Sequence, residues 1–310
     1  MKNEEYRNIF AGELFEGEVR FMEPMSSHTS LRIGGPADIL AVPKDFDSLK
    51  NIHLNLIKNR IPYVTLGSGT NVLIMDGGIE GAVVSLRSLK KIDITHESDE
   101  FVDIYAEAGA LLPKLVLFAR ERYYSGIEGL AGIPGTFGGA ICGNSGAFGY
   151  EIKDVVLSVE IMDKAGKVSR RNREEMSFGY RRSGIAHDEF IVGALMRLRK
   201  ERSGEVSKRV DDFLRMKKER QPIREVSAGC VFKNPAGKPA GRLLDEAGCK
   251  GAKIGDVEVS EVHANFFINK GRANASDFLK LMELVSRRVE RKFGITLEPE
   301  IRILGRAIAD

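Results

Sequence analysis

The sequence predicts a fold that mixes α-helices and β-strands and is divided into two domains. The chain has 310 residues, which is more than one average domain contains. Its apolar residues recur at helical spacing in some segments and form short strand-like runs in others. Two glycine-rich segments, 67–71 and 126–149, interrupt these elements. We expect a first domain at 1–200, with subdomains at about 28–90 and 91–200, and a second domain at 201–310.

The expected helices are those segments whose apolar residues lie three and four positions apart. In the segment 45–59, Leu49, Ile52 and Leu56 form such a stripe, and His53 beside them is expected to pack rather than to bind a ligand. The helices are expected at 4–18, 45–59, 111–122, 200–220 and 275–292, the last with Gly294 as its C-cap. The strands are expected at 39–42, 102–106, 155–162, 190–198, 257–259, 265–268 and 295–304.

The segment 126–149 carries the first functional signal. Glycine recurs every few residues, and the residues between the glycines are mostly apolar, such as Ile127, Leu130 and Phe137. A flexible linker would not carry apolar residues at this density, so we expect an ordered, packed segment. Glycine lets the backbone approach a ligand closely, and exposed N–H groups bind anions. The segment therefore predicts a wall of backbone amides against a phosphorylated cofactor; the alternative is a packed loop without a ligand.

The second glycine-rich segment reads GSGTN at 67–71, between two strand-like runs. It is not a phosphate-binding Walker loop, because no Gly-Lys-Ser/Thr follows. It is not a Rossmann fingerprint either, because no helix follows. Alone it could be a hairpin turn, but two such loops in one domain indicate a dinucleotide held by amides rather than by lysines.

Composition excludes several other classes. The net charge of +3 is too small to indicate nucleic acid, although it suits a small acidic substrate. The first residues, MKNEEYRNIF, are charged where a signal peptide would be apolar, and no apolar run reaches the length of a membrane span. The cysteines are Cys142, Cys230 and Cys249, without a CxxC pair, which argues against zinc and disulfides. We expect a cytoplasmic protein that binds neither membranes nor metal.

Six motifs in one order resemble those of a known family. They are GSGTN at 67–71, GIPGTFGGAICGNSGAFG at 132–149, SFGYRRS at 177–183, SAGCVFKNP at 227–235, VHANFFIN at 262–269 and EPEIR at 298–302. Together they resemble the MurB family of UDP-N-acetylenolpyruvoylglucosamine reductases. The resemblance extends from about His28 to Gly305. It implies an α+β fold: an FAD-binding module of the vanillyl-alcohol-oxidase (PCMH) type in two subdomains, followed by a substrate domain.

The resemblance also implies a reaction. NADPH is the hydride donor, FAD is held noncovalently, and the enolpyruvyl ether of UDP-N-acetylglucosamine is reduced to UDP-N-acetylmuramate for peptidoglycan synthesis. Arg181 matches the cation beside the substrate carboxylate, and Glu300 matches a glutamate paired with the same developing enol. Cys230 stands where many members have serine and is expected to donate a proton to C2. From the sequence alone, Arg181 would be read as a solvated arginine. The alternative for Cys230 is a small buried cysteine packed under a strand, with water supplying the proton.

The remaining site residues also follow from the match. The expected cofactor-binding residues are Gly67, Ser68, Gly69, Thr70, Asn71, Gly132, Ile133, Pro134, Gly135, Gly138, Gly139, Ala140, Asn144 and Gly146. The expected substrate-binding residues are Tyr180, Lys233, Asn234 and Arg220, with Lys217 and Lys218 as alternatives to Arg220 for the diphosphate. The short spacing between Arg181 and Cys230 resembles the shorter type of the family, which lacks a tyrosine lid segment. We expect a monomer.

Two other functions stay open on the sequence. The chain could be another vanillyl-alcohol-oxidase-type oxidoreductase, although the GSGTN loop lacks the histidine that often binds flavin covalently there. It could also be a non-catalytic flavin-binding protein. Such a protein would have no reason to combine Arg181, Cys230 and Glu300.

Overall fold

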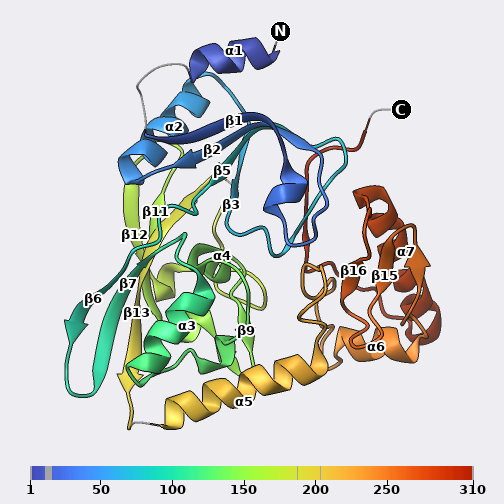
Figure 1. Ribbon diagram of the computed structural model, residues 1–310. Helices are drawn as coiled ribbons and strands as arrows, with labels where there is room; N and C mark the ends of the chain where they lie inside the picture. Colours follow the sequence, from blue (N-terminus) through green and yellow to red (C-terminus); the bar gives the residue numbers. More distant parts are fainter. Residues whose placement is uncertain (1, 11–15, 187, 203, 309–310) are drawn as a thin grey trace. The chain divides into compact units, whose positions relative to one another are not determined.

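The computed structural model describes residues 2–10, 16–186, 188–202 and 204–308, and it contains two compact units that are not continuous in sequence. Unit 1 comprises Met1–Phe21, Ile39–Ser68 and Gly81–Met216. Unit 2 comprises Met22–Asp38, Gly69–Glu80 and Lys217–Asp310. The helices and strands are labelled in Figure 1. The predicted boundary after residue 200 stays a prediction.

Unit 1 is built mainly on two sheets. The first has the order β1-β2-β5-β3, and β3 and β5 run parallel, with Tyr63 opposite Ala82. The second has the order β12-β11-β13-β7-β6, is antiparallel, and has β8 paired with β13. The strands are β1 (Gly17–Pro24), β2 (Pro36–Pro43), β3 (Tyr63–Leu66), β5 (Ile79–Ser85), β6 (Ile92–Glu97), β7 (Phe101–Glu107), β8 (Tyr124–Ser125), β11 (Val156–Met162), β12 (Val168–Asn172) and β13 (Phe190–Lys200). The last residues of β1 and the first residues of β2 and β5 belong to unit 2.

The helices of unit 1 each contribute at least one buried apolar residue to its core. They are α1 (Lys2–Ile9), α2 (Phe46–Lys58), α3 (Leu112–Glu121), α4 (Phe137–Cys142) and α5 (Glu205–Arg220), the last of which continues into unit 2. Asp45 caps α2 by accepting a hydrogen bond from Ser48 N at 2.8 Å. The predicted helices at 45–59 and 111–122 are therefore confirmed within two residues at each end. His53 is fully buried and packs edge-on against Phe190, as expected.

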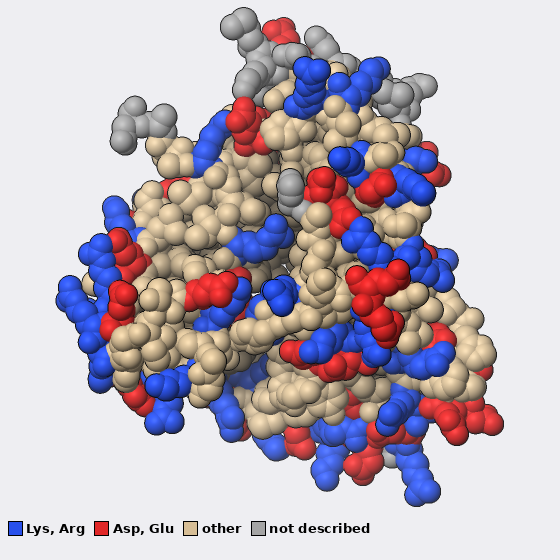
Figure 2. Space-filling view, turned by 180° about the vertical axis from the view of Figure 1, so that it is seen from behind, with Lys and Arg blue, Asp and Glu red and all other residues tan. Residues whose placement is uncertain are grey.

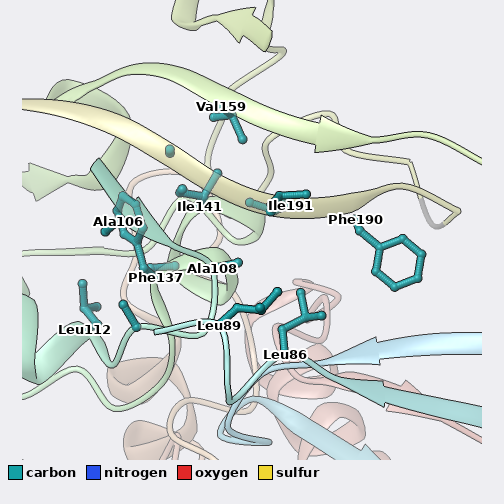
Figure 3. Close-up of a cluster of buried hydrophobic side chains, with 14 of the residues drawn as sticks. Leu86, Leu89, Ala106, Ala108, Leu112, Phe137, Ile141, Val159, Phe190 and Ile191 are labelled. Atoms are coloured by element: carbon teal, nitrogen blue, oxygen red, sulfur yellow. The ribbon is translucent and has the colours of Figure 1, made fainter. Parts of the chain in front are cut away.

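The core of unit 1 joins the second sheet to the glycine-rich segment. Phe137 and Ile141 of α4 are fully buried, and α4 packs on β7 and β13. Figure 3 shows them beside Ala106, Ala108 and Leu112. The glycine-rich segment is thus fixed to the sheet by its apolar residues, which confirms that it is an ordered part of the fold.

Unit 2 has its own core and two small sheets. The three strands β14 (Lys253–Ile254), β15 (Val257–Val259) and β16 (Phe267–Asn269) form an antiparallel meander. Two helices, α6 (Ala240–Glu246) and α7 (Ala275–Phe293), pack with it around the buried Phe267 and Phe278. Gly294 adopts φ 64° as the left-handed C-cap of α7, which confirms the predicted end of this helix.

A second, parallel pair in unit 2 joins distant parts of the chain. Strand β17 (Arg302–Leu304) pairs with β4 (Val72–Ile74), which directly follows the GSGTN loop. The predicted final strand at 295–304 was too long, because only these three residues form a ladder. The predicted helix at 4–18 was also too long: α1 ends at Ile9 and β1 begins at Gly17, while residues 11–15 lie outside the described part.

Candidate active site

The glycine-rich segment presents an exposed edge above a buried base. Gly132, Pro134 and Gly139 are exposed, whereas Phe137 and Ile141 are fully buried. Gly132 and Gly135 have φ of 71° and 128°, a region that favours glycine. After α4 the chain forms a small hairpin of β9 (Gly146–Ala147) and β10 (Tyr150–Glu151). The segment can therefore offer bare backbone to a flat ligand.

Several of the N–H groups in this segment already donate to protein acceptors. Gly138 N donates to Ala108 O at 2.8 Å, Ile133 N to Leu130 O at 3.0 Å, and Ala140 N to the carbonyl of Thr136 at 2.9 Å. A Cβ atom at Gly138 would lie 2.7 Å from the Ala108 Cβ, so packing explains this glycine. Because these N–H groups are already used, the predicted contacts of these residues with the cofactor would come mainly from the close approach of the cofactor to the backbone and less from hydrogen bonds to phosphate.

The first glycine loop meets the second at its start. A Cβ atom at Gly67 would lie 2.5 Å from Thr136 Oγ1, the atom that caps α4 by accepting from Gly139 N at 3.3 Å. The two predicted cofactor loops thus lie against each other at this point, and glycine is needed for their approach. Ser68 follows and is partly exposed.

The remainder of this loop belongs to unit 2 and contacts the final strand. Gly69 has φ 63°, and its carbonyl accepts from Ser30 N at 3.0 Å. Asn71 is exposed, yet its Nδ2 donates to the Glu300 carbonyl at 3.2 Å and its own carbonyl accepts from Arg302 N at 3.1 Å. Thr70 between them is partly exposed. A predicted cofactor loop and a predicted catalytic residue are therefore joined by hydrogen bonds.

Arg181 of unit 1 lies in a tight turn after the motif SFGY. Arg182 N donates to Gly179 O at 3.2 Å, which makes Arg181 the third residue of the turn, with φ 56°. The Arg181 guanidinium donates from Nη2 to Gly146 O at 3.4 Å and lies 5.1 Å from the Tyr180 ring centre. Arg181 is partly exposed and Tyr180 is exposed. The arginine thus stands beside the β9–β10 hairpin of the glycine-rich segment.

Asn144, predicted as a cofactor contact, has a different set of side-chain partners. It is fully buried, and its Nδ2 donates to Gly179 O at 3.0 Å and to Glu151 Oε2 at 3.2 Å. Burial raises the pKa of Glu151, but hydrogen bonds from Lys153 and Asn144 and the charges of Lys153 and Arg181 hold it below its usual value. Any cofactor contact of Asn144 would therefore come from its backbone.

Cys230 and Glu300 are brought together within unit 2. Glu300 N donates to the carbonyl of Val231 at 2.8 Å, so the two predicted residues lie on adjacent, hydrogen-bonded segments. Cys230 forms a backbone bridge with Phe266 on its other side. Both Cys230 and Glu300 are partly exposed. Arg181 belongs to the other unit.

The predicted substrate-binding residues differ in their partners and in how deeply they are buried. Lys233 forms an ion pair with Glu298, and the exposed Asn234 accepts a hydrogen bond at Oδ1 from Ala240 N at 2.9 Å. In α5, Lys218 and Arg220 are exposed, whereas Lys217 is buried. Burial lowers the pKa of the Lys217 ammonium to about 8.

Sequence reasoning missed a buried ion pair at the start of the glycine-rich segment. Glu128 is 1% exposed and accepts from Arg209 Nε at 2.9 Å, from Ser125 Oγ at 2.9 Å and from Gly126 N at 2.6 Å. Arg209 also donates to Glu201 at 2.7 Å. The signal was present in the sequence, because Glu128 is the one charged residue of an otherwise apolar and glycine-rich segment. The pair attaches this segment to α5.

Two features are absent from the described residues. These residues contain no group of three or more His, Cys, Asp or Glu that could hold a metal ion. None of their helices is both long and apolar enough to cross a membrane. Figure 2 shows that Lys and Arg are interspersed with Asp and Glu on the face in view.

Comparison with known proteins first defines the class. Residues 37–171 match the family described as FAD binding domain, and the chain is therefore a flavoprotein with an α+β FAD-binding module of the vanillyl-alcohol-oxidase (PCMH) type. The predicted fold class is confirmed. Residues 221–304 match the family described as UDP-N-acetylenolpyruvoylglucosamine reductase, C-terminal domain.

The relatives define the family. A UDP-N-acetylenolpyruvoylglucosamine reductase of Caldanaerobacter subterraneus subsp. tengcongensis is 43% identical over 293 residues, covering 94% of this chain and 95% of the relative. The protein of the same name from Clostridioides difficile is 39% identical, covering 98% and 99%. The crystal structure of the Thermus caldophilus enzyme, MurB, aligns with a TM-score of 0.79 at 34% identity, covering 93% and 99%. The chain belongs to the UDP-N-acetylenolpyruvoylglucosamine reductase family.

Proposed function

We propose that this chain reduces the enolpyruvyl group of its substrate with Arg181, Cys230 and Glu300 as the reacting side chains. Family membership supplies the reaction, which is the FAD- and NADPH-dependent reduction of UDP-N-acetylenolpyruvoylglucosamine in peptidoglycan synthesis. It favours this function over another flavin oxidoreductase or a non-catalytic flavin-binding protein. The observation that carries the residue assignment is the hydrogen-bonded pairing of the Cys230 and Glu300 segments.

The glycine loops fit a flat dinucleotide. The exposed edge at Gly132, Pro134 and Gly139 has no bulky side chain, and Gly67 allows the two loops to meet. Residues 67–71 together with 132–135, 138–140, 144 and 146 would hold FAD noncovalently. Bound FAD would supply the hydride chemistry that links NADPH oxidation to reduction of the substrate double bond.

Arg181 would act on the substrate carboxylate. Reduction of the enol ether places negative charge on the carbon beside this carboxylate, and the charge is stabilised if it spreads onto the carboxylate oxygens. A guanidinium held in place favours this form, because it is complementary to charge that develops during the reaction. Its planar fork also fits two carboxylate oxygens. Tyr180 lies under this cation and would contact the same group.

Cys230 would deliver the proton that completes the reaction. The product needs a proton at C2, and a thiol, with an ordinary pKa near 8.5, is a far stronger acid than a serine hydroxyl. Glu300 would stabilise the developing enol from the neighbouring segment. Both residues are partly exposed and lie on hydrogen-bonded segments of one unit, which supports assigning them to one substrate group.

The nucleotide part of the substrate requires cations and amides. Lys233 and Asn234 follow Cys230 on the same segment and would line the site. Lys217, Lys218 and Arg220 are the candidates for the diphosphate, and Lys217 is distinguished by its burial. The partner of the chain is thus a small nucleotide sugar, and we propose a cytoplasmic monomer that binds neither nucleic acid nor membrane.

The two half-reactions, followed separately, test the assignment. In anaerobic stopped-flow mixing, Arg181→Lys and Glu300→Gln should slow flavin reoxidation by UDP-N-acetylenolpyruvoylglucosamine about 10²–10³-fold. Flavin reduction by NADPH should change little. The exposed neighbour Arg182 offers a matched control, because Arg182→Lys should change neither step. Equal losses in both half-reactions would mean that Arg181 and Glu300 support the flavin or the fold instead.

A further inference from the structure

The conformation of Arg181 requires support from its surroundings. Gly179 and Arg182 close its turn with two backbone hydrogen bonds, of 3.0 and 3.2 Å. The third position of such a turn with φ 56° is normally glycine or asparagine, because a larger side chain is strained there. Strained residues persist when neighbouring structure holds them, and they concentrate at functional sites. Side chains on both sides of the turn hold it in place.

Asn144 holds the turn on its first side. Its Nδ2 donates to Gly179 O at 3.0 Å, two residues before Arg181. The second hydrogen of Nδ2 goes to Glu151 at 3.2 Å, and Oδ1 accepts from Lys153 N at 3.2 Å. Asn144 is fully buried, so this amide is fixed in one orientation by three protein partners.

Ser183 holds the turn on its other side. Its Oγ donates to the carbonyl of Cys142 at 3.0 Å, and Ser183 is only 2% exposed. Cys142 is the last residue of α4, where helix carbonyls lack partners within the helix. Two residues before Arg181 and two residues after it, the chain is therefore tied to positions 144 and 142 of the glycine-rich segment.

We propose that Asn144 and Ser183 are positioning residues that hold the Arg181 turn against the end of α4. The inference rests on the proposed role of Arg181 and gives Asn144 a task other than cofactor contact. The side chain of Arg181 itself adds a third tie through Nη2 to Gly146 O at 3.4 Å. All of these groups belong to unit 1. The same segment thus carries the predicted flavin edge and holds the guanidinium to which the proposed function assigns the substrate carboxylate.

Ser183→Ala is the first test, because it removes the hydroxyl that bonds Cys142 O and requires no change in the backbone. In the FAD-loaded enzyme, flavin reoxidation by UDP-N-acetylenolpyruvoylglucosamine should slow about 10–100-fold, since small misplacements of a reacting group have effects of this size. Flavin reduction by NADPH and FAD retention should stay at wild-type values. Ser158→Ala on β11 is the control, because Ser158 is equally buried at 4% and lies in the same unit.

A double-mutant cycle separates positioning from a general structural effect. In the Arg181→Lys background, Ser183→Ala should slow reoxidation no further, because Ser183 acts through the guanidinium. The affinity for the same substrate, measured by calorimetry on the oxidised enzyme without NADPH, should show the same non-additivity in the absence of turnover. Effects that add in both measurements would overturn the proposal.

Asn144→Gly provides an independent variant, since glycine accepts the φ of 40° at this position and only the amide is lost. It should reproduce the selective loss of the reoxidation step. If this variant does not fold, the double-mutant cycle of Ser183→Ala with Arg181→Lys tests the positioning proposal by itself. If Arg181→Lys alone reoxidises at the wild-type rate, the proposed function of Arg181 fails. If Arg181→Lys is slow but Ser183→Ala is not, the positioning proposal alone fails.

Discussion

Replacing Lys217 by methionine tests the effect of burying a charged lysine in α5. Lys217 is 5% exposed, whereas its neighbour Lys218 is exposed. Methionine has a similar length and no charge, so the change removes the ammonium and keeps most of the packing. Burial lowers the pKa of this ammonium from 10.5 to about 8.

The size of the effect follows from this shift. At about 1.4 kcal/mol per pKa unit, the charged form costs the folded state about 3 kcal/mol at neutral pH. The folded pKa lies below the unfolded one, so between about pH 8 and about pH 10.5 the unfolded chain binds more protons. The contribution of Lys217 to the free energy of unfolding should therefore become more favourable as the pH rises through this window, and the comparison with Lys217→Met isolates it from the other titrating groups.

Urea unfolding of the FAD-loaded protein measures this contribution. The difference in unfolding free energy between Lys217→Met and wild type should narrow by about 2 kcal/mol from about pH 7 to about pH 9.5. Lys218 lies on the exposed side of the same helix, so the unfolding free energy of Lys218→Met should change with pH in parallel with that of the wild type. Parallel curves for Lys217→Met as well would refute the reasoning, because the ammonium would then be as well solvated as an exposed one.

Proton uptake on substrate binding provides a second measurement on Lys217. If Lys217 meets the diphosphate, the added negative charge favours its protonated form, and binding at about pH 8.5 should take up a proton. Calorimetry in buffers of different ionisation enthalpy detects this uptake, which Lys217→Met should abolish. Wild-type binding without proton uptake would assign the diphosphate to Lys218 or Arg220.

Three further predictions concern the proton donor, the cofactor and the buried ion pair. Cys230→Ala should slow product formation about 10²–10⁴-fold while flavin reduction continues, and Cys230→Ser should recover much of the rate; wild-type single-turnover reoxidation by Cys230→Ala would exclude the thiol. Acid precipitation should leave a yellow supernatant, because FAD is held noncovalently; a yellow pellet would point to attachment, for which Cys142 in the glycine-rich segment is the candidate. Glu128→Gln should lower the unfolding free energy by about 2–3 kcal/mol, less than for a fully buried pair because the Arg209 side chain is 31% exposed; an unchanged urea midpoint would contradict this.

The local elements could largely be predicted from the sequence. The helices α2, α3 and α7 carry apolar residues at helical spacing along most of their length, and Gly294 ends α7 at a position only glycine fills easily. These signals are local, because a helix satisfies its own backbone hydrogen bonds within a few residues. Strands need partners, and their extents were less well predicted. Strand β17 is shorter than the predicted strand at 295–304, because only Arg302–Leu304 pairs with β4.

Six motifs in one order predicted the family and the flavin-binding fold from the sequence alone, and the comparisons confirm both, whereas the residues of the site stay a prediction. Only the tertiary structure shows which of the predicted residues lie on hydrogen-bonded segments. It placed the Glu300 segment against that of Cys230, directed the Asn144 amide to Gly179, and buried Lys217 while leaving Lys218 exposed. Spacing along a chain fixes the face on which a side chain lies, whereas its partner is fixed by packing between segments that are remote in sequence.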